Sequence, residues 1–81
     1  MLISYKINVT EALKEAGFNG STAKQTGIFS QSTMRKFKEG DTGITLDNLN
    51  RLCCILEMQP RDIIKFTETD EDRNNILKNI K

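Results

Sequence analysis

The sequence has no histidine and no tryptophan, and its two cysteines, Cys53 and Cys54, are adjacent. Histidine is the most common metal ligand and general base, and adjacent cysteines fit neither a disulfide framework nor the C-x-x-C spacing of a zinc site. No activated nucleophile or phosphate-cradling glycine loop is present in the pattern. We therefore expect no metal, no cofactor, no small-molecule ligand and no enzymatic activity, with Cys53 in the core and Cys54 half-buried.

Long hydrophobic runs are also missing. The first residues, MLISYKINV, show no charged segment followed by an apolar run, and no stretch approaches the roughly 18 apolar residues of a membrane span. The pattern indicates a soluble, cytoplasmic protein with no membrane partner. At 81 residues and 37% hydrophobic content, the chain has room for one small core but not for a deep catalytic cleft.

Acidic residues are absent from residues 16–38, which carry four cations: Lys24, Arg35, Lys36 and Lys38. Residues 39–62 reverse the sign, with five acids against two arginines, although the whole chain has a net charge of only +1. Segregated charge of this kind indicates that one face binds an anionic partner. The alternative is that a window of this length lacks acids by chance.

The hydrophobic pattern predicts short helices preceded by a short strand at Ile3 and Tyr5. Asn8 is expected to cap a first helix, Ser21 a second that ends at Gly27, and Thr45 a fourth. Pro60 fits the first position of a fifth helix, with an extended segment behind it that can form a ribbon with the amino terminus. Apolar faces are predicted for two of these helices. The face of the first helix consists of Val9, Ala12, Leu13 and Ala16. The face of the fourth helix consists of Leu46, Leu49, Leu52, Cys53 and Leu56.

The chain ends in a further short segment of helical pattern. Asp70 is expected to cap a helix over residues 71–80, which carries Ile76, Leu77 and Ile80 on one side. A helix this short is unstable alone, so it must pack on the body, pair with a partner subunit, or fray.

The segment Ser21 to Phe37, STAKQTGIFSQSTMRKF, is the most informative in the chain. Two short polar helical segments flank Gly27 and Ile28, which is typical of a helix-turn-helix. Ser30 can cap the second segment, whose outward side chains suit the reading of base edges, whereas its inward side chains suit a core. The outward residues are Gln31, Ser32, Arg35 and Lys36, and the inward ones Met34 and Phe37. The alternative is an ordinary solvated helix face.

These motifs, together with TLDNLNRLCCILEMQPRDIIKF later in the chain, resemble the Cro and CI-type (lambda-repressor-like, XRE) helix-turn-helix family of phage and bacterial repressors. The resemblance covers about residues 8–66 and is closest to the small single-domain branch. It implies an all-α bundle of about five short helices, with a two-stranded ribbon joining the termini and an extra C-terminal helix. We expect a DNA-binding domain over residues 1–69 and a helical tail over residues 70–81.

The resemblance also implies how the chain binds double-stranded DNA. The second helix would cross the phosphate backbone and the third would lie in the major groove. The base-reading positions of the family then fall on Gln31, Ser32, Arg35 and Lys36, and the phosphate-contacting positions on Ser21, Lys24, Ser30 and Lys38.

The expected function is a sequence-specific transcriptional regulator, a repressor of a phage or mobile element. We expect a homodimer, since one short helix contacts too few base pairs to select a genomic site. Its expected seam is Ile76, Leu77 and Ile80, with the strand near Ile3 and Tyr5 as a further candidate. The alternative is a protein-interaction module on the same fold, such as a phage inhibitor or an antitoxin-like protein, because a fold hosts many functions.

Overall fold

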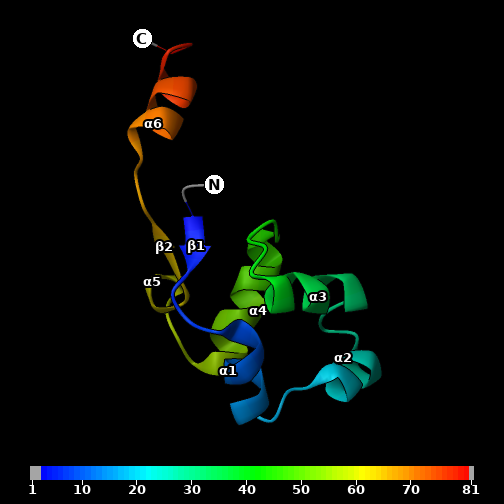
Figure 1. Ribbon diagram of the computed structural model, residues 1–81. Helices are drawn as coiled ribbons and strands as arrows, with labels where there is room; N and C mark the ends of the chain where they lie inside the picture. The colour runs from blue at the N-terminus through cyan, green and yellow to red at the C-terminus, as the bar shows by residue number, and fades with distance from the viewer. Residues whose placement is uncertain (1–2, 81) are drawn as a thin grey trace.

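The computed structural model describes residues 3–80, whose elements follow in the order β1, α1 to α5, β2 and α6 (Figure 1). Helices α1 to α5 and the two strands form a body, and α6 stands away from it beyond the ribbon. The molecule is therefore elongated, 48 × 21 × 19 Å. The bounds are β1 Ile3–Tyr5, α1 Val9–Glu15, α2 Gly20–Thr26, α3 Gln31–Glu39, α4 Leu46–Leu56, α5 Pro60–Ile63, β2 Ile64–Phe66 and α6 Asp70–Leu77.

Side-chain caps start the helices of the body. The side-chain oxygens of Asn8, Ser30 and Thr45 each accept the backbone N–H of the residue three positions later at 3.1 Å. A cap of this kind stabilises a helix by about 1 kcal/mol. The predicted caps of α1 and α4 and the predicted start of α3 are confirmed, as is Pro60 at the first position of α5.

Two predicted caps are wrong. Helix α2 is capped by Asn19, which accepts the N–H of Thr22 at 3.0 Å, so that Ser21 lies inside the first turn. Helix α6 is capped by Thr69 rather than Asp70, since the N–H of Asp72 donates to the Thr69 hydroxyl at 3.3 Å. In both cases a second capping residue precedes the predicted one, and the helix begins at the earlier position.

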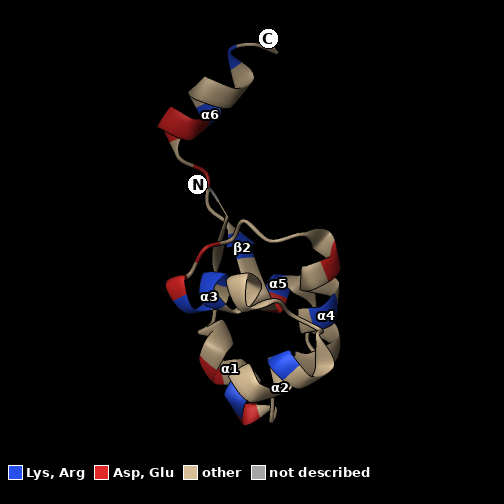
Figure 2. Cartoon of the chain, turned by 90° about the vertical axis from the view of Figure 1, so that its right-hand side faces the viewer, with Lys and Arg blue, Asp and Glu red and all other residues tan. Residues whose placement is uncertain are grey.

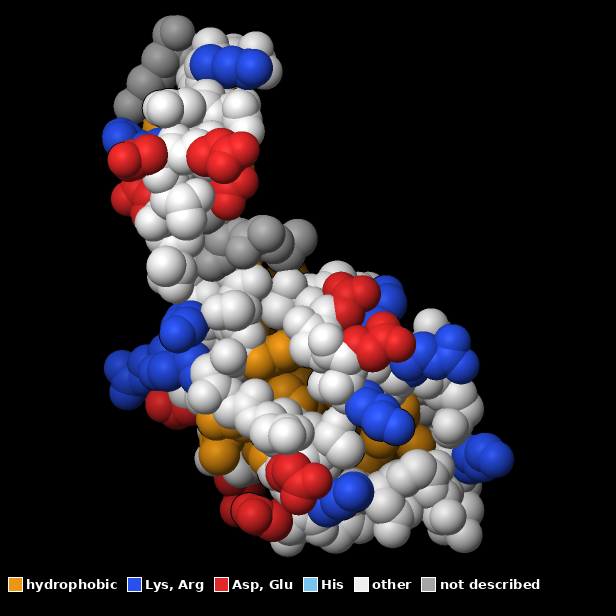
Figure 3. Space-filling model, in the orientation of Figure 1, with side chains coloured by type: hydrophobic (Ala, Val, Ile, Leu, Met, Phe, Trp, Pro, Cys, Tyr) orange, Lys and Arg blue, Asp and Glu red, His pale blue; other side chains and the backbone are white. Residues whose placement is uncertain are grey.

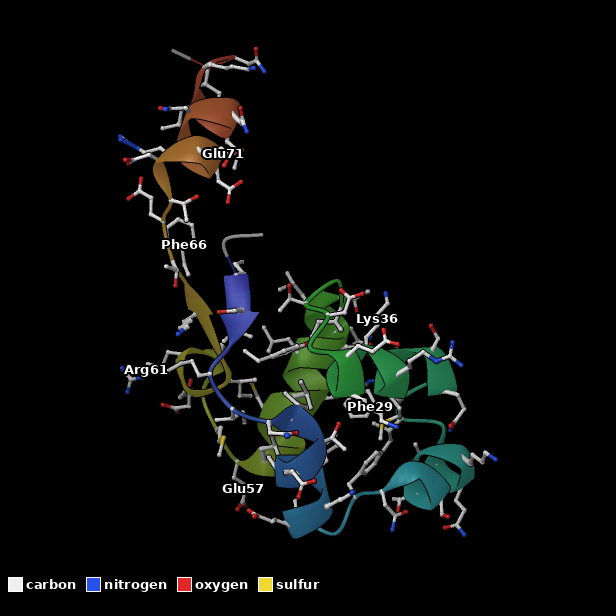
Figure 4. All side chains as sticks on the ribbon, viewed as in Figure 1. Phe29, Lys36, Glu57, Arg61, Phe66 and Glu71 are labelled. Atoms are coloured by element: carbon white, nitrogen blue, oxygen red, sulfur yellow. The ribbon has the colours of Figure 1, made fainter. Side chains whose placement is uncertain are left out.

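The core is built around three phenylalanines from different parts of the chain. The ring of Phe29 meets Phe18 and Phe37 edge-on, with centroid separations of 5.5 and 5.0 Å. Phe29 points into the space between α1, α2 and α3 (Figure 4). Phe18, predicted only as part of a turn, is buried because Gly17 adopts a left-handed φ of 85° and turns the chain inward. The other fully buried residues are Val9, Leu13, Ala23, Leu52 and Ile63.

The apolar face of α4 is narrower than predicted. Leu52 is fully buried, Cys53 and Leu56 pack against the core, and Leu49 is half-buried. Leu46, by contrast, is exposed. At about 100° per residue, six residues place Leu46 roughly 120° around the helix from Leu52, outside the face that meets the core.

Two small residues also differ from expectation. Cys54 follows Leu52 by two positions and therefore lies on the opposite side of α4, where it is exposed rather than half-buried. Ala16 is exposed because α1 ends at Glu15 and the chain turns at Ala16 and Gly17.

The predicted ribbon is present. Strands β1 and β2 pair antiparallel, with Ile3 opposite Phe66 and Tyr5 opposite Ile64. The N–H of Lys6 extends the pairing by donating to the carbonyl of Ile63 at 2.8 Å. A mostly helical bundle with a small two-stranded ribbon and an additional C-terminal helix confirms the predicted fold class.

Candidate nucleic-acid interface

Helices α2 and α3 are joined by a tight turn. Helix α2 ends at Gly27, whose φ of 69° lies in the left-handed region that glycine tolerates best. The Thr26 hydroxyl donates to the carbonyl of Thr22 at 2.7 Å and accepts the N–H of Ile28 at 3.3 Å. Buried Phe29 then anchors the turn immediately before α3 begins. These contacts fix the direction of α3 relative to α2.

Helix α3 has an inner side that packs and an outer side that does not. Phe37 is buried and Met34 is half-buried against the core, whereas Gln31, Ser32 and Arg35 are exposed. Gln31, Arg35 and Lys38 line a shallow groove together with Met34, Glu39 and, from α1, Thr10. The structure therefore brings Gln31 and Arg35 to one groove and leaves Ser32 exposed on the same helix.

The fourth predicted reader, Lys36, lies differently. It is half-buried, and its ammonium donates to the carbonyl of Gly43 at 2.7 Å. Figure 4 shows its side chain beside the loop that joins α3 to α4. This hydrogen bond uses one of the three donors of the Lys36 ammonium and holds the side chain at the loop.

The α3–α4 loop is also tied to the ribbon. The Tyr5 hydroxyl donates to the carbonyl of Asp41 at 2.9 Å, and the Thr42 hydroxyl to that of Ile3 at 3.4 Å. Burial, and next the negative charge of Asp41, raises the pKa of Tyr5 above its ordinary value of 10.0. Tyr5 is therefore a neutral hydrogen-bond donor at neutral pH.

The residues that are predicted to contact phosphate lie on α2 and at both ends of α3. Ser21 and Lys24 are exposed on α2, and Lys38 is exposed near the end of α3. The Ser30 hydroxyl already acts as the α3 cap and also donates to the Thr33 hydroxyl at 2.9 Å. Within residues 3–80 the structure shows no ion pair for Lys24, Arg35 or Lys38, so these three cations face solvent unneutralised. Figure 2 shows lysine and arginine on α2 and α3 on the side of the body turned to the viewer.

Two residues at this surface were missed by the sequence analysis. Arg51 of α4 donates to the carbonyl of Ile28 in the turn and forms an ion pair with Asp47, with Nη2 and Oδ2 3.2 Å apart. The Asp47–Arg51 spacing of four residues signals such a pair, but its contact with the turn is visible only in three dimensions. Glu39 is exposed on α3, one turn beyond Arg35, and adds negative charge to an otherwise cationic surface.

The predicted seam residues lie far from this surface. Ile76 and Ile80 are exposed and Leu77 is half-buried, and no residue of α6 is buried in the core. Ile76 and Leu77 line a small apolar groove with Phe66 of β2.

A tight glycine turn between two short helices, with an uncovered polar side on the second, defines a helix-turn-helix protein. The family model of the Cro/C1-type HTH DNA-binding domain matches residues 1–69 of this chain. The chain belongs to this family and is a DNA-binding protein, which confirms the resemblance of its motifs. No match was found among curated proteins or among solved structures.

Two further observations concern residues 3–80 only. No helix in that range is both long and apolar enough to cross a membrane. No cluster of three or more cysteine, aspartate or glutamate side chains in that range is placed to hold a metal ion.

Proposed function

We propose that the protein is a transcriptional regulator, acting as a repressor, that reads double-stranded DNA with α3 in the major groove. The observation that carries the proposal is the outer side of α3, where Gln31, Ser32 and Arg35 are exposed and no other element covers them. Ser30 sets the start of α3, so Gln31 and Ser32 lie in its first turn, the part of a recognition helix that contacts base edges.

The side-chain chemistry suits direct readout of bases. Glutamine can bond adenine N6 and N7 together, arginine favours guanine O6 and N7, and serine is permissive. Gln31 and Arg35 are therefore assigned most of the discrimination between bases, and Ser32, which lies between them in the sequence, a permissive contact. Lys36 fixes the loop behind α3 through its bond to Gly43, so its part in reading bases is smaller than that of Gln31 and Arg35.

The cations beside α3 supply affinity that does not depend on sequence. Lys24 and Lys38 flank the reading residues from α2 and from the end of α3, where they suit phosphates on either side of the groove. Ser21, and Ser30 through its hydroxyl and backbone amide at the start of α3, would add neutral phosphate contacts. Replacing Lys38 with Ala should lower the slope of log affinity against log salt by about 0.9, the value for one neutralised phosphate.

We further propose that the protein acts as a cytoplasmic homodimer on a two-fold related site. Residues 1–69 form the DNA-binding domain, and residues 70–81 a tail that supplies dimer contacts through Ile76, Leu77 and Ile80. Two half-sites then lie about one helical turn, or 34–36 Å, apart. The resemblance to repressors of phages and mobile elements supports a similar origin for this chain.

Selection of bound sequences from randomised duplexes tests the proposal. The expected result is one recurrent, two-fold symmetric sequence, bound at least about a thousandfold more tightly than random DNA. Binding to random duplexes should weaken steeply with salt. Salt-independent binding, or the absence of any enriched sequence, would instead favour a protein-interaction module on the same fold.

A further inference from the structure

The large hydrophobic side chains that remain exposed all lie at one end of the molecule. They come from the ribbon, from the first turn of α4 and from the chain at and beyond α6, on the upper side in Figure 1. Among the described residues these are Ile3, 41% exposed, Leu46, 83%, Phe66, 64%, Ile76, 56%, and Ile80, 73%.

Three observations join four of these side chains, all but Ile80, into one strip. Ile3 and Leu46 line one groove of the body, together with Tyr5, Ile44, Leu49 and Ile64. Hydrophobic side chains reach the surface between β1 and α4 in Figure 3. Ile3 is paired with Phe66 across the ribbon, and Phe66 lines a second groove with Ile76 and Leu77. We call these the body groove and the arm groove, the arm being residues 67–80.

The two halves of the strip have complementary shapes. The body groove is a hollow between the ribbon and the start of α4, whereas α6 is a short helix that stands clear of the body (Figures 1 and 2). A helix of this kind suits a hydrophobic groove, with Ile76 on the helix as one anchor and Ile80, in the turn that follows the helix, as another. Neither groove is lined by a residue of α3, so covering them leaves the DNA-binding surface free.

The exposed area indicates that a second copy covers the strip. If a complete large hydrophobic side chain carries roughly 150–200 Å² of accessible surface, the five exposed fractions amount to on the order of 500 Å² per copy. Two copies then bury on the order of 1,000 Å², which is the minimum for a specific interface. Ile76 and Ile80 alone supply less than half of this area. A seam limited to the tail is too small, and the body groove must take part.

We propose that the dimer forms by reciprocal exchange of arms, with α6 of each copy seated in the body groove of the other. The proposal rests on the homodimer of the proposed function and adds its receptor site, Leu46 and Ile3. Each copy gives one arm and accepts one, so the arrangement is two-fold symmetric and closes at two copies.

Disulfide cross-linking tests where the arm lies. The variants Leu46→Cys and Ile76→Cys are made separately, in a background with Cys53→Ala and Cys54→Ser, then mixed and mildly oxidised. The expected product is a disulfide-linked dimer of the two variants, at a yield well above that of either variant alone. A single chain that carries both Leu46→Cys and Ile76→Cys is the control for an arm that folds back on its own body. If it forms an internal disulfide and stays monomeric, the arm folds back on its own body and the proposal is overturned.

A charge substitution gives a second measurement that leaves the cysteines in place. Leu46→Lys should raise the dimer dissociation constant at least about tenfold in sedimentation, as expected for loss of a central apolar anchor. Ala16→Lys, at an exposed position that lines neither groove, is the matched control and should leave it unchanged. The thermal midpoint, extrapolated to low concentration, should be equal in both variants, because Leu46 contributes little to the core.

The outcomes separate this inference from the proposed function. If Leu46→Lys and Ala16→Lys are equally dimeric, the body groove is not the receptor, whatever the DNA measurements show. If the unmodified protein is monomeric both free and on its selected sequence, the dimer itself is overturned while readout by α3 stands. At concentrations where both variants are monomeric they should bind random DNA equally, since α3 is untouched in both.

Discussion

The body and the arm of this protein are stabilised in different ways. Every fully buried side chain among residues 3–80 belongs to the body, where three phenylalanine rings meet edge-on and capped helices surround them. The arm has a cap at Thr69 and an ion pair between Arg73 and Glu68, 2.8 Å apart, but buries nothing in the core. Exposed pairs of this kind contribute at most about 1 kcal/mol. We therefore expect the body to fold without a partner, whereas the arm needs one to be more than a marginal helix.

The largest expected difference between the two regions is in stability. Leu52→Ala should lower the free energy of unfolding by about 2–5 kcal/mol, because Leu52 is completely buried and its removal leaves a cavity. Ile80→Ala should change it by less than about 0.5 kcal/mol under conditions where the protein is monomeric. Chemical denaturation of both variants measures the contrast. Equal losses would show that the arm is part of the folding unit and would remove the distinction between the regions.

The next largest effect concerns DNA binding and should depend on the body alone. Gln31→Ala should weaken binding to the selected sequence by about 1–3 kcal/mol and relax one base position in each half-site, while binding to random DNA changes little. Asn50→Ala removes a similar amide from an exposed position of α4 and serves as the control. Titrations on both DNAs give the comparison. Equal losses on specific and random DNA for Gln31→Ala would contradict a base-reading role.

A smaller effect is expected from the polar contact that holds the turn. Arg51→Leu removes the donor from the carbonyl of Ile28 and the ion pair with Asp47, and should cost about 1 kcal/mol of stability. Because the turn directs α3, the ratio of specific to random DNA affinity should also fall. Arg61→Leu, at an exposed position of α5, is the control. If Arg51→Leu lowers stability without changing that ratio, Arg51 has no part in positioning α3.

Local features of the fold could be predicted from the sequence because local chemistry determines them. Asn8 and Thr45 cap their helices through hydrogen bonds that span three residues, and Gly27 ends α2 because its backbone favours the left-handed region. The ribbon followed from alternation at one end and an extended segment at the other. Each of these depends on a few neighbouring residues.

Features that depend on distant parts of the chain could not be predicted in the same way. Leu46 belongs to the periodic pattern of α4 but lies outside the face that meets the core, which only the packing of the helices decides. Lys36 has the position of a base reader, yet the loop that follows α3 returns close enough to accept its ammonium hydrogen. Arg51 reaches a carbonyl 23 residues away in the chain. The assignment of bases and phosphates to individual side chains remains a prediction for binding experiments.

An effect of similar or smaller size is expected within the body, where the Tyr5 hydroxyl of β1 donates to the carbonyl of Asp41 in the α3–α4 loop. Tyr5→Phe should lower stability by about 0.5–1.5 kcal/mol at neutral pH, the net value of one hydrogen bond. Since burial, and then the charge of Asp41, raises the pKa of Tyr5 above 10.0, the folded protein holds this proton more tightly than the unfolded chain. This contribution is fully present below pH 10 and is lost as the pH rises through the raised pKa. Unfolding curves of the two proteins should therefore differ at pH 7 and converge as the pH rises through the raised pKa of Tyr5. A constant difference across that range would show that the hydroxyl does not titrate there, so that the contact is not linked to pH.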